Sequence, residues 1–304
     1  MSKHLKIAIL GVGGVGGYIG AKLAQNGHDV TLIARGKHFE AIKQQGLHVN
    51  DNGETFTVHP QLIHTEDREA LKNVTFDVVF ITTKSYDFQN ACAIIADSLH
   101  ASTLIIPLAN GVNHKAELQN YLHTGILCDG CVYILSNIES YGVIHKKNET
   151  FYLLFGSERE DEKFTLLAEL LNASGLRSKY SNTIEYDCWK KYLFIAPFAT
   201  LTSYFKQPIG YVVKEERELL DAVLAEIKAV ANALAIPISK EDIAKVIRQA
   251  ENVPYDSKTS MQIDFEKGHQ TELEVLCGYI VLEAKRLGIE VVNMERMYGE
   301  LVSL

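Results

Sequence analysis

The sequence lacks any apolar run near the roughly 18 residues that a membrane-spanning helix needs. Its first predicted strand is entered by Ile7, so we expect no signal peptide before it. No basic stripe offsets the net charge of -8, and this balance argues against nucleic acid as the main partner. We therefore expect a cytoplasmic protein that acts on a small molecule and binds neither a membrane nor nucleic acid.

Cysteine is scarce and scattered, with five residues at Cys92, Cys128, Cys131, Cys188 and Cys277. Only Cys128 and Cys131 have the CxxC spacing of a redox or metal site, and no second pair with ligand spacing follows. The pair also lies beside an apolar stretch that is typical of a strand. We therefore expect buried structural thiols and no metal site.

A glycine-rich loop between the first two predicted strands gives the strongest functional signal in the chain. An apolar run over 7–10 leads into Gly11-x-Gly13-x-x-Gly16, an amphipathic stretch follows over 18–25, and a second apolar run covers 30–34. Strand, glycine turn, helix and strand in this order are typical of a dinucleotide-binding site. We predict that the cofactor pyrophosphate binds at this helix N-terminus, on Gly11, Gly13, Gly14, Val15 and Gly16.

The second predicted strand ends without an acidic residue, in the segment Ala34-Arg35-Gly36-Lys37-His38. A carboxylate at this point would bind the ribose 2′-hydroxyl of NAD and repel a 2′-phosphate. A guanidinium instead binds phosphate through paired charge-assisted hydrogen bonds. The alternative is that Arg35 is a solvated loop residue. We predict NADPH/NADP as the cofactor, with Arg35 on its 2′-phosphate and Lys37 and His38 as further candidates.

The first half of the chain alternates β-rich runs with helical patterns, which indicates a parallel doubly wound sheet. Predicted strands cover 6–10, 30–33, 78–82 and 103–107, and predicted helices cover 15–26, 37–45, 86–99 and 113–122. Further strand-like runs are expected to extend this sheet as antiparallel strands, at 127–135, 142–146 and 150–155.

Beyond about Asn182 the pattern becomes helical, with predicted helices over 183–204, 214–235, 239–251 and 271–288. Ser239 followed by Asp242 resembles a capping box at the start of one of them. The fold class we predict is α/β, with a Rossmann-type sheet followed by an all-helical part. The predicted domains are an NADP-binding domain over 1–180 and a helical substrate and catalytic domain over 181–304.

Two polar segments follow predicted strands at the sheet edge where ligands bind in such folds. One contains Lys84 and the other contains Asn110-Gly111. Lys84 is otherwise a helix-start lysine, and Asn110-Gly111 is otherwise a plain turn. Their shared edge favours a role beside the cofactor.

The helical half offers two more candidates, which local pattern alone does not settle. Lys190 and Lys191 lie inside an apolar helical stretch, where one lysine can point to solvent while the other faces the interdomain side. A lysine partly removed from water has a lowered pKa and can act as a general acid, although it can also extend over aromatic side chains to reach solvent. Thr271 suits an N-cap, and Glu272 or Glu274 in the first turn could merely interact favourably with the helix dipole.

Taken together, the motifs resemble those of the ketopantoate reductase family, the 2-dehydropantoate 2-reductases. The resemblance covers nearly the whole chain and rests on features in a fixed order: the glycine loop, the arginine after the second strand, Lys84-Ser-Tyr86, Asn110-Gly111, Trp189-x-Lys191, and Ser260-Met261 with Glu272 twelve residues after Ser260. It implies NADPH-dependent reduction of 2-dehydropantoate to pantoate, a step of pantothenate biosynthesis.

The resemblance also implies a role for each matching residue. Lys191 matches the lysine that protonates the carbonyl oxygen, and Glu272 the acid that contacts substrate and cofactor and helps to position that lysine. Ser260 matches the residue that binds the substrate carboxylate. Asn110 matches an asparagine between cofactor and substrate, and Lys84 matches a lysine that lines the cofactor site.

The chain departs from the family pattern on the helical face of Lys191. Typical members carry asparagines four and eight residues after the lysine, where this chain has Ile195 and Ala199. Pro197 lies between them and is expected to kink the helix. The alternatives are therefore a reductase of a more apolar 2-oxo acid, or a catalytically silent NADP(H)-binding protein. The apolar C-terminal helices are compatible with a homodimer, and the sequence leaves the oligomeric state open.

Overall fold

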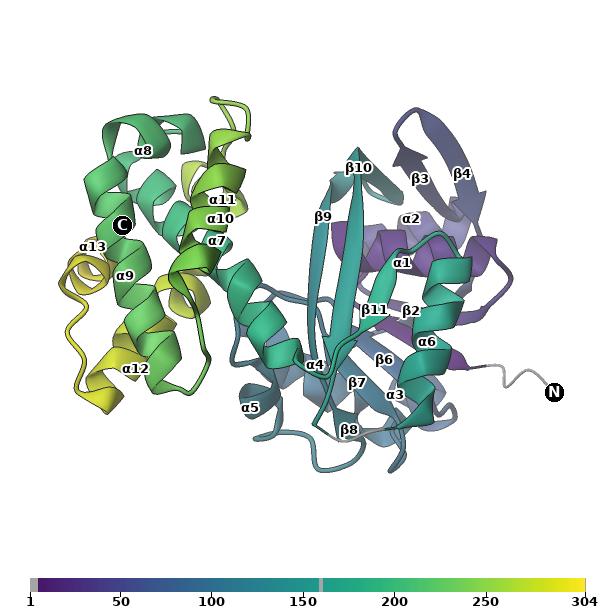
Figure 1. The fold of residues 1–304 in the computed structure, drawn as a ribbon. Coiled ribbons are helices and arrows are strands. Elements are labelled where there is room, and N and C mark those ends of the chain that lie inside the picture. Colours follow the sequence, from purple (N-terminus) through teal and green to yellow (C-terminus); the bar gives the residue numbers. More distant parts are fainter. Residues whose placement is uncertain (1–4, 159–160, 304) are drawn as a thin grey trace. The chain divides into compact units, whose positions relative to one another are not determined.

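The computed structural model describes residues 5–158 and 161–303, and the chain divides into two compact units (Figure 1). The first, which we call the sheet unit, contains the residues up to Ala109 and His114–Ile184. The second, the helical unit, contains Asn110–Asn113 and the residues from Glu185 onward. A short loop from the first half of the chain thus belongs with the helices of the second half.

Six parallel strands form the main sheet of the sheet unit, in the order β5-β2-β1-β6-β7-β8. Their bounds are β1 (Lys6–Leu10), β2 (Asp29–Ala34), β5 (Gln61–His64), β6 (Val78–Ile81), β7 (Leu104–Pro107) and β8 (Ile126–Leu127). β1 lies between β2 and β6, so the direction of winding reverses at β1. This is the strand order of dinucleotide-binding sheets, and the predicted Rossmann-type fold is confirmed.

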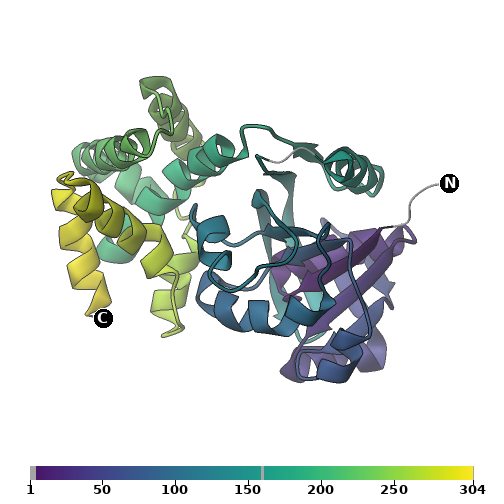
Figure 2. The same ribbon diagram turned by 90° about the horizontal axis from the view of Figure 1, so that it is seen from below.

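Both faces of the parallel sheet are buried, which explains why its strands are continuous apolar runs. In β1, Ile7 and Ile9 belong to one core with residues of α1 (Gly14–Gln25). Ala8 and Leu10, which point to the opposite face, belong to another core with residues of α4 (Phe88–Ile95). Figure 2 shows the same unit from below.

A second sheet of five strands was not anticipated, and the expected antiparallel extension of the main sheet is wrong. The order is β11-β10-β3-β4, with β9 paired to β10, and the bounds are β3 (Leu47–Asp51), β4 (Glu54–Val58), β9 (Asp129–Ser140), β10 (Val143–Gly156) and β11 (Ser178–Tyr180). Only β8 joins the main sheet, and it does so in parallel. The long hairpin of β9 and β10 is plain in Figure 1.

The other helices of the sheet unit are α2 (Gly36–Gln45), α3 (Arg68–Lys72), η1 (Ser85–Asp87), η2 (Ala96–Ser98), α5 (His114–Leu118) and α6 (Glu162–Ala173). α2 covers the helix predicted over 37–45, whereas α5 is shorter than the helix predicted over 113–122. The helix predicted over 86–99 is divided into η1, α4 and η2. α3 and α6 were not predicted.

The described residues of the helical unit form helices and no strands. Their bounds are α7 (Ile184–Phe205), α8 (Ile209–Glu215), α9 (Arg217–Ala233), α10 (Lys240–Glu251), α11 (Ser260–Glu266), the π-helical η3 (Glu274–Gly278), α12 (Tyr279–Leu287) and α13 (Val292–Val302). The predicted capping box is confirmed, because Ser239 and Asp242 exchange side-chain to backbone hydrogen bonds at the start of α10. Among the described residues, we find no helix with the length and apolarity to span a bilayer.

Two expectations for the helical unit need correction. The helix predicted over 214–235 corresponds to α9, which begins only at Arg217, because the chain leaves helical geometry at Glu216 and residues 214 and 215 end α8. The helix predicted over 271–288 begins later and opens with the π-helical turn η3. Pro197 does not end α7, which continues to Phe205.

Candidate active site

The glycine loop connects β1 to α1 at the centre of the parallel sheet. Gly11 has a φ of +97°, which L side chains rarely adopt, and a Cβ there would lie 2.9 Å from the backbone nitrogen of Thr83. Thr82 closes the turn, because its hydroxyl donates to the carbonyl of Gly11. A glycine is therefore required at position 11, because the chain turns there in close contact with Thr82 and Thr83, which follow β6.

The other loop glycines divide into two that face protein and one that faces open space. A Cβ on Gly16 would overlap the Thr82 hydroxyl and the Gly11 carbonyl, and a Cβ on Gly14 would lie 2.5 Å from the carbonyl oxygen of Ser136 on β9. A Cβ on Gly13 would have no heavy atom within 4 Å. Gly13 is the N-cap of α1 and offers no side-chain cap, and the first turn carries no acid. The helix N-terminus therefore fits an anion such as a pyrophosphate.

We predict that alanine substitutions will separate folding from cofactor binding in this loop. Gly13→Ala places its methyl group in the open space, so thermal stability should be retained while binding of a nicotinamide dinucleotide weakens at least about tenfold. Gly16→Ala forces the loop apart, and its melting temperature should fall by several degrees. Gly299→Ala, at an open helical position, is the control. Differential scanning fluorimetry and titrations with NADH and NADPH give both readouts, and unweakened dinucleotide binding by Gly13→Ala would contradict this geometry.

The cationic residues after β2 are engaged in different ways. Arg35 is the N-cap of α2 and is largely exposed, and its Nη2 lies 3.0 Å from Oδ2 of Asp87. Lys37 lies over the ring of Tyr141, with Nζ 5.9 Å from the ring centre. His38 is buried, its Nδ1 accepts a hydrogen bond from the amide of Gly142, and burial lowers its pKa. A neutral, buried His38 is a poor phosphate ligand, so Arg35 and Lys37 are the better candidates.

The two adjacent lysines of α7 have different partners. Nζ of Lys190 lies 2.6 Å from the carboxylate of Asp187 and 4.6 Å from the ring centre of Tyr186. Although burial acts against its charge, the bond to Asp187 raises the pKa of Lys190. Lys191 instead donates to Oδ1 of Asn110 at 3.0 Å. Of the two lysines, Lys191 is thus the one with a hydrogen bond to another predicted site residue, Asn110.

Lys191, Asn110 and Glu272 form a hydrogen-bonded set within the helical unit, which we call the amide bridge. Oδ1 of Asn110 accepts from the Lys191 ammonium, and Nδ2 donates to Oε2 of Glu272 at 3.3 Å. An ammonium can only donate and a carboxylate can only accept, so the two neighbours fix the orientation of the amide. Glu272 is only 2% exposed and lies just before the helix rather than on its solvent side.

Tyr192 ties together the two helical segments that carry the amide bridge. Its buried hydroxyl lies 3.1 Å from the carbonyl of Val275 and 3.0 Å from that of Leu276, both in η3. A π-helical turn has carbonyls displaced from the regular ladder, which leaves them available to such a donor. Sequence reasoning missed Tyr192 because an aromatic residue in an apolar helix is ordinary core. Its position next to Lys191 was the one available signal.

The remaining predicted site residues lie outside the amide bridge. Ser260 is exposed at the first position of α11, and among the described residues no hydrogen bond joins it to the bridge. Ile195 is half-buried and Ala199 is buried on α7, one and two turns after Lys191. Lys84 follows β6, and Asn110 follows β7, the strand paired with β6.

The five cysteines are all buried and none forms a disulfide, as expected for structural thiols. Burial raises the pKa of Cys128 to about 12. A thiol that stays protonated is a poor nucleophile and a poor metal ligand. In the described part of the chain, no group of three histidine, cysteine or acidic residues is arranged to hold a metal ion.

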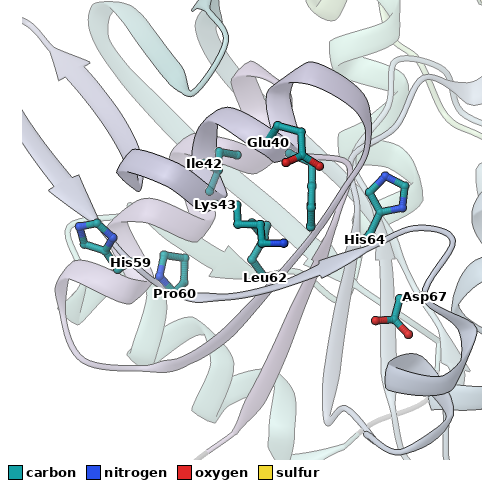
Figure 3. Close-up of a pocket in the computed structure, with 9 residues that line it drawn as sticks. Glu40, Ile42, Lys43, His59, Pro60, Leu62, His64 and Asp67 are labelled. Atoms are coloured by element: carbon teal, nitrogen blue, oxygen red, sulfur yellow. The ribbon is translucent and has the colours of Figure 1, made fainter.

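Figure 3 shows a pocket on the sheet unit that contains none of the predicted site residues. It lies against α2 and the strand β5, and it is lined by Phe39, Glu40, Ile42, Lys43, His59, Pro60, Leu62, His64 and Asp67. Its lining mixes acidic, basic and apolar side chains, and it includes no residue of the glycine loop. We therefore place the candidate nucleotide site at the glycine loop.

Comparison with known proteins gives the family. The family model described as Ketopantoate reductase PanE/ApbA matches residues 7–157, and that of its C-terminal domain matches residues 183–303. The chain belongs to the ketopantoate reductase family. It is therefore an oxidoreductase of this family, as the motifs indicated.

Individual relatives of the ketopantoate reductase family cover nearly the whole chain. "Uncharacterized oxidoreductase YkpB" of Bacillus subtilis (strain 168) is 31% identical over 301 residues, with 98% of each chain covered. The crystal structure of 2-dehydropantoate 2-reductase from Porphyromonas gingivalis W83 is 30% identical, covering 99% of this chain and 100% of that one, with a TM-score of 0.86. A D-mandelate dehydrogenase structure with NADH shares the fold at 22% identity, with 98% and 97% covered and a TM-score of 0.89.

Proposed function

We propose that the protein catalyses the NADPH-dependent reduction of 2-dehydropantoate to pantoate. The observation that carries the proposal is the amide bridge, in which one asparagine joins a lysine and a buried carboxylate, in a chain that matches the ketopantoate reductase family over both halves. We also propose that the sheet unit is the nucleotide-binding domain and the helical unit the catalytic domain. Reduction of a 2-oxo acid needs a bound hydride donor, a proton donor and a ligand for the substrate carboxylate. The chain contains candidate residues for binding the hydride donor and for the other two roles.

The glycine loop and the residues after β2 and β6 are the candidates for holding NADPH. Bound there, the cofactor supplies the hydride for the keto carbon. Gly13 and the N-terminus of α1 would take the pyrophosphate, Gly11, Gly14 and Gly16 would shape the loop, and Val15 would offer a backbone amide. Arg35 would take the 2′-phosphate, and Lys84 would line the site.

Lys191 is the proposed general acid. Its ammonium would donate a proton to the carbonyl oxygen of the substrate and, before that, stabilise the negative charge that develops on this oxygen. Asn110 fixes the direction of the ammonium by accepting a hydrogen bond from it. Glu272 would accept a hydrogen bond from the substrate hydroxyl and contact the cofactor, while its bond to Asn110 helps to position Lys191.

Ser260 is the proposed ligand of the substrate carboxylate, because its hydroxyl is exposed at the N-terminus of α11. Thr259, rather than Ser260, caps this helix, since its Oγ1 accepts from the amide of Gln262. The Thr259 hydroxyl also lies 2.8 Å from that of Thr202 on α7. The hydroxyl of Ser260 is therefore not needed for the cap.

Ile195 and Ala199 favour a second candidate, the reduction of a more apolar 2-oxo acid. Both lie on the face of α7 that continues from Lys191, and neither offers a hydrogen bond to a substrate hydroxyl. A site that loses such bonds loses discrimination for a hydroxylated substrate.

Steady-state kinetics on the two substrates test the proposal. We expect NADPH oxidation to be faster with ketopantoate than with 2-oxoisovalerate, which lacks the hydroxyl group, by at least about tenfold in kcat/KM. The reverse order would favour the second candidate. Binding of NADPH without turnover of either acid would contradict both and favour a silent NADP(H)-binding protein.

A further inference from the structure

We propose that Asp87 limits the preference for NADPH, so that the enzyme also uses NADH. The inference rests on the proposed nucleotide site but not on the identity of the substrate. The chain has no acid at the end of β2, where NAD-binding folds commonly carry one. In the structure, an acid from the turn that follows a different strand, β6, lies beside Arg35.

The ion pair of Arg35 and Asp87 spans the strand that carries the glycine loop. Arg35 directly follows β2, and Asp87 lies in η1 after β6, while β1 pairs with both strands. Nη2 of Arg35 lies 3.0 Å from Oδ2 of Asp87. All three segments belong to the sheet unit. The carboxylate is therefore at the carboxyl edge of the parallel sheet, beside the guanidinium that was assigned to the 2′-phosphate.

Local structure holds Asp87 in this position. Its amide donates to the carbonyl of Lys84 at 3.0 Å, which closes the turn η1. Its Oδ1 accepts from Nδ2 of Asn90 at 3.4 Å. The Asp87 side chain is 24% exposed, whereas that of Arg35 is 64% exposed. Asp87 is thus the anchored member of the pair and Arg35 the member that can turn.

The two basic residues that follow Gly36, Lys37 and His38, have contacts away from Arg35. Lys37 is directed over Tyr141, and His38 is buried with a lowered pKa. A 2′-phosphate approaching Arg35 would meet a guanidinium already paired with a carboxylate, and the phosphate and carboxylate would repel each other. A 2′-hydroxyl has no such conflict, because it can donate a hydrogen bond to the carboxylate. The pair therefore favours NADH relative to a site with Arg35 alone.

Binding measurements on charge variants test this inference without any substrate. The dissociation constants of NADPH and NADH are measured by cofactor fluorescence for wild type, Asp87→Asn and Asp87→Glu. Asp97→Asn is the matched control, because Asp97 is an exposed acid of the sheet unit paired with Lys72. We expect Asp87→Asn to raise the preference for NADPH over NADH about tenfold, the effect of removing one nearby charge. Asp87→Glu and Asp97→Asn should keep the wild-type preference within about threefold.

A change of less than about threefold for Asp87→Asn, or an equal change for Asp97→Asn, would overturn the inference. Asp87→Ser, which also removes the charge, replaces the Asn variant if that protein does not fold. A wild-type protein that binds neither dinucleotide would overturn the cofactor site and this inference together. Binding of both cofactors with the expected shift, but no turnover of ketopantoate, would contradict only the proposed substrate.

Discussion

Replacing Lys191 with alanine is expected to lower kcat for ketopantoate reduction by about 10³-fold, while NADPH binding changes little. The variant loses the proton donor and the positive charge that opposes the developing alkoxide. Folding should be retained because Lys191 is only partly buried and no core cluster includes it. The measurement is the steady-state rate together with a separate NADPH titration.

Lys190→Ala is the control for this result, since it removes a lysine from the adjacent position of the same helix. Lys190 pairs with Asp187 and lies outside the amide bridge, so its removal should change kcat by less than about threefold. Equal losses for the two variants would indicate a general effect on α7 and contradict the assignment of Lys191 as the acid.

The second large effect is expected for Glu272→Gln, with kcat lowered by about 10²-fold and the melting temperature unchanged or raised. Glutamine keeps the size of the side chain and one acceptor oxygen for Nδ2 of Asn110, but it removes the negative charge and replaces the second acceptor with a donor. A buried carboxylate is costly to keep in a fold, so neutralising it should not destabilise the protein. Activity and thermal unfolding are compared in the same preparations.

Glu274→Gln provides the matched control two residues further on. Glu274 is exposed and accepts a hydrogen bond from the hydroxyl of Tyr298, so it is structural rather than part of the amide bridge. Its substitution should leave kcat within about twofold of wild type. If Glu272→Gln retained full activity, or lost activity only through unfolding, the proposed role of Glu272 would be wrong.

The parallel sheet could be predicted because its signals are local. Strands buried on both faces are continuous apolar runs, and the glycine loop marks the turn between β1 and α1. The second sheet gave no such signal. β3 and β4 mix buried, partly buried and exposed positions, and β10 pairs with β3 across a separation of about a hundred residues. Pairing at that distance depends on tertiary packing, which a local pattern does not contain.

The amide bridge could be anticipated only through the family resemblance. Asn110 is separated from Lys191 by 81 positions and from Glu272 by 162, so no spacing rule connects them. On its local pattern alone, Glu272 is interpreted as an acidic residue in the first turn of a helix, with no functional role. Asp87 gave no signal at all, because an acid in a turn after a strand is ordinary. Its pairing with Arg35 depends on the order of β2, β1 and β6 in the sheet.

Transfer of deuterium from the cofactor to the product tests the central claim most directly. Ketopantoate is incubated with the wild-type protein and NADPH in which both hydrogens at C4 of the nicotinamide are replaced by deuterium, and the product is analysed by mass spectrometry. The account predicts pantoate with one deuterium at C2, formed by wild type and by Lys190→Ala but only in trace amounts by Lys191→Ala. Deuterium-free pantoate, or no reduced product from wild type, would contradict it.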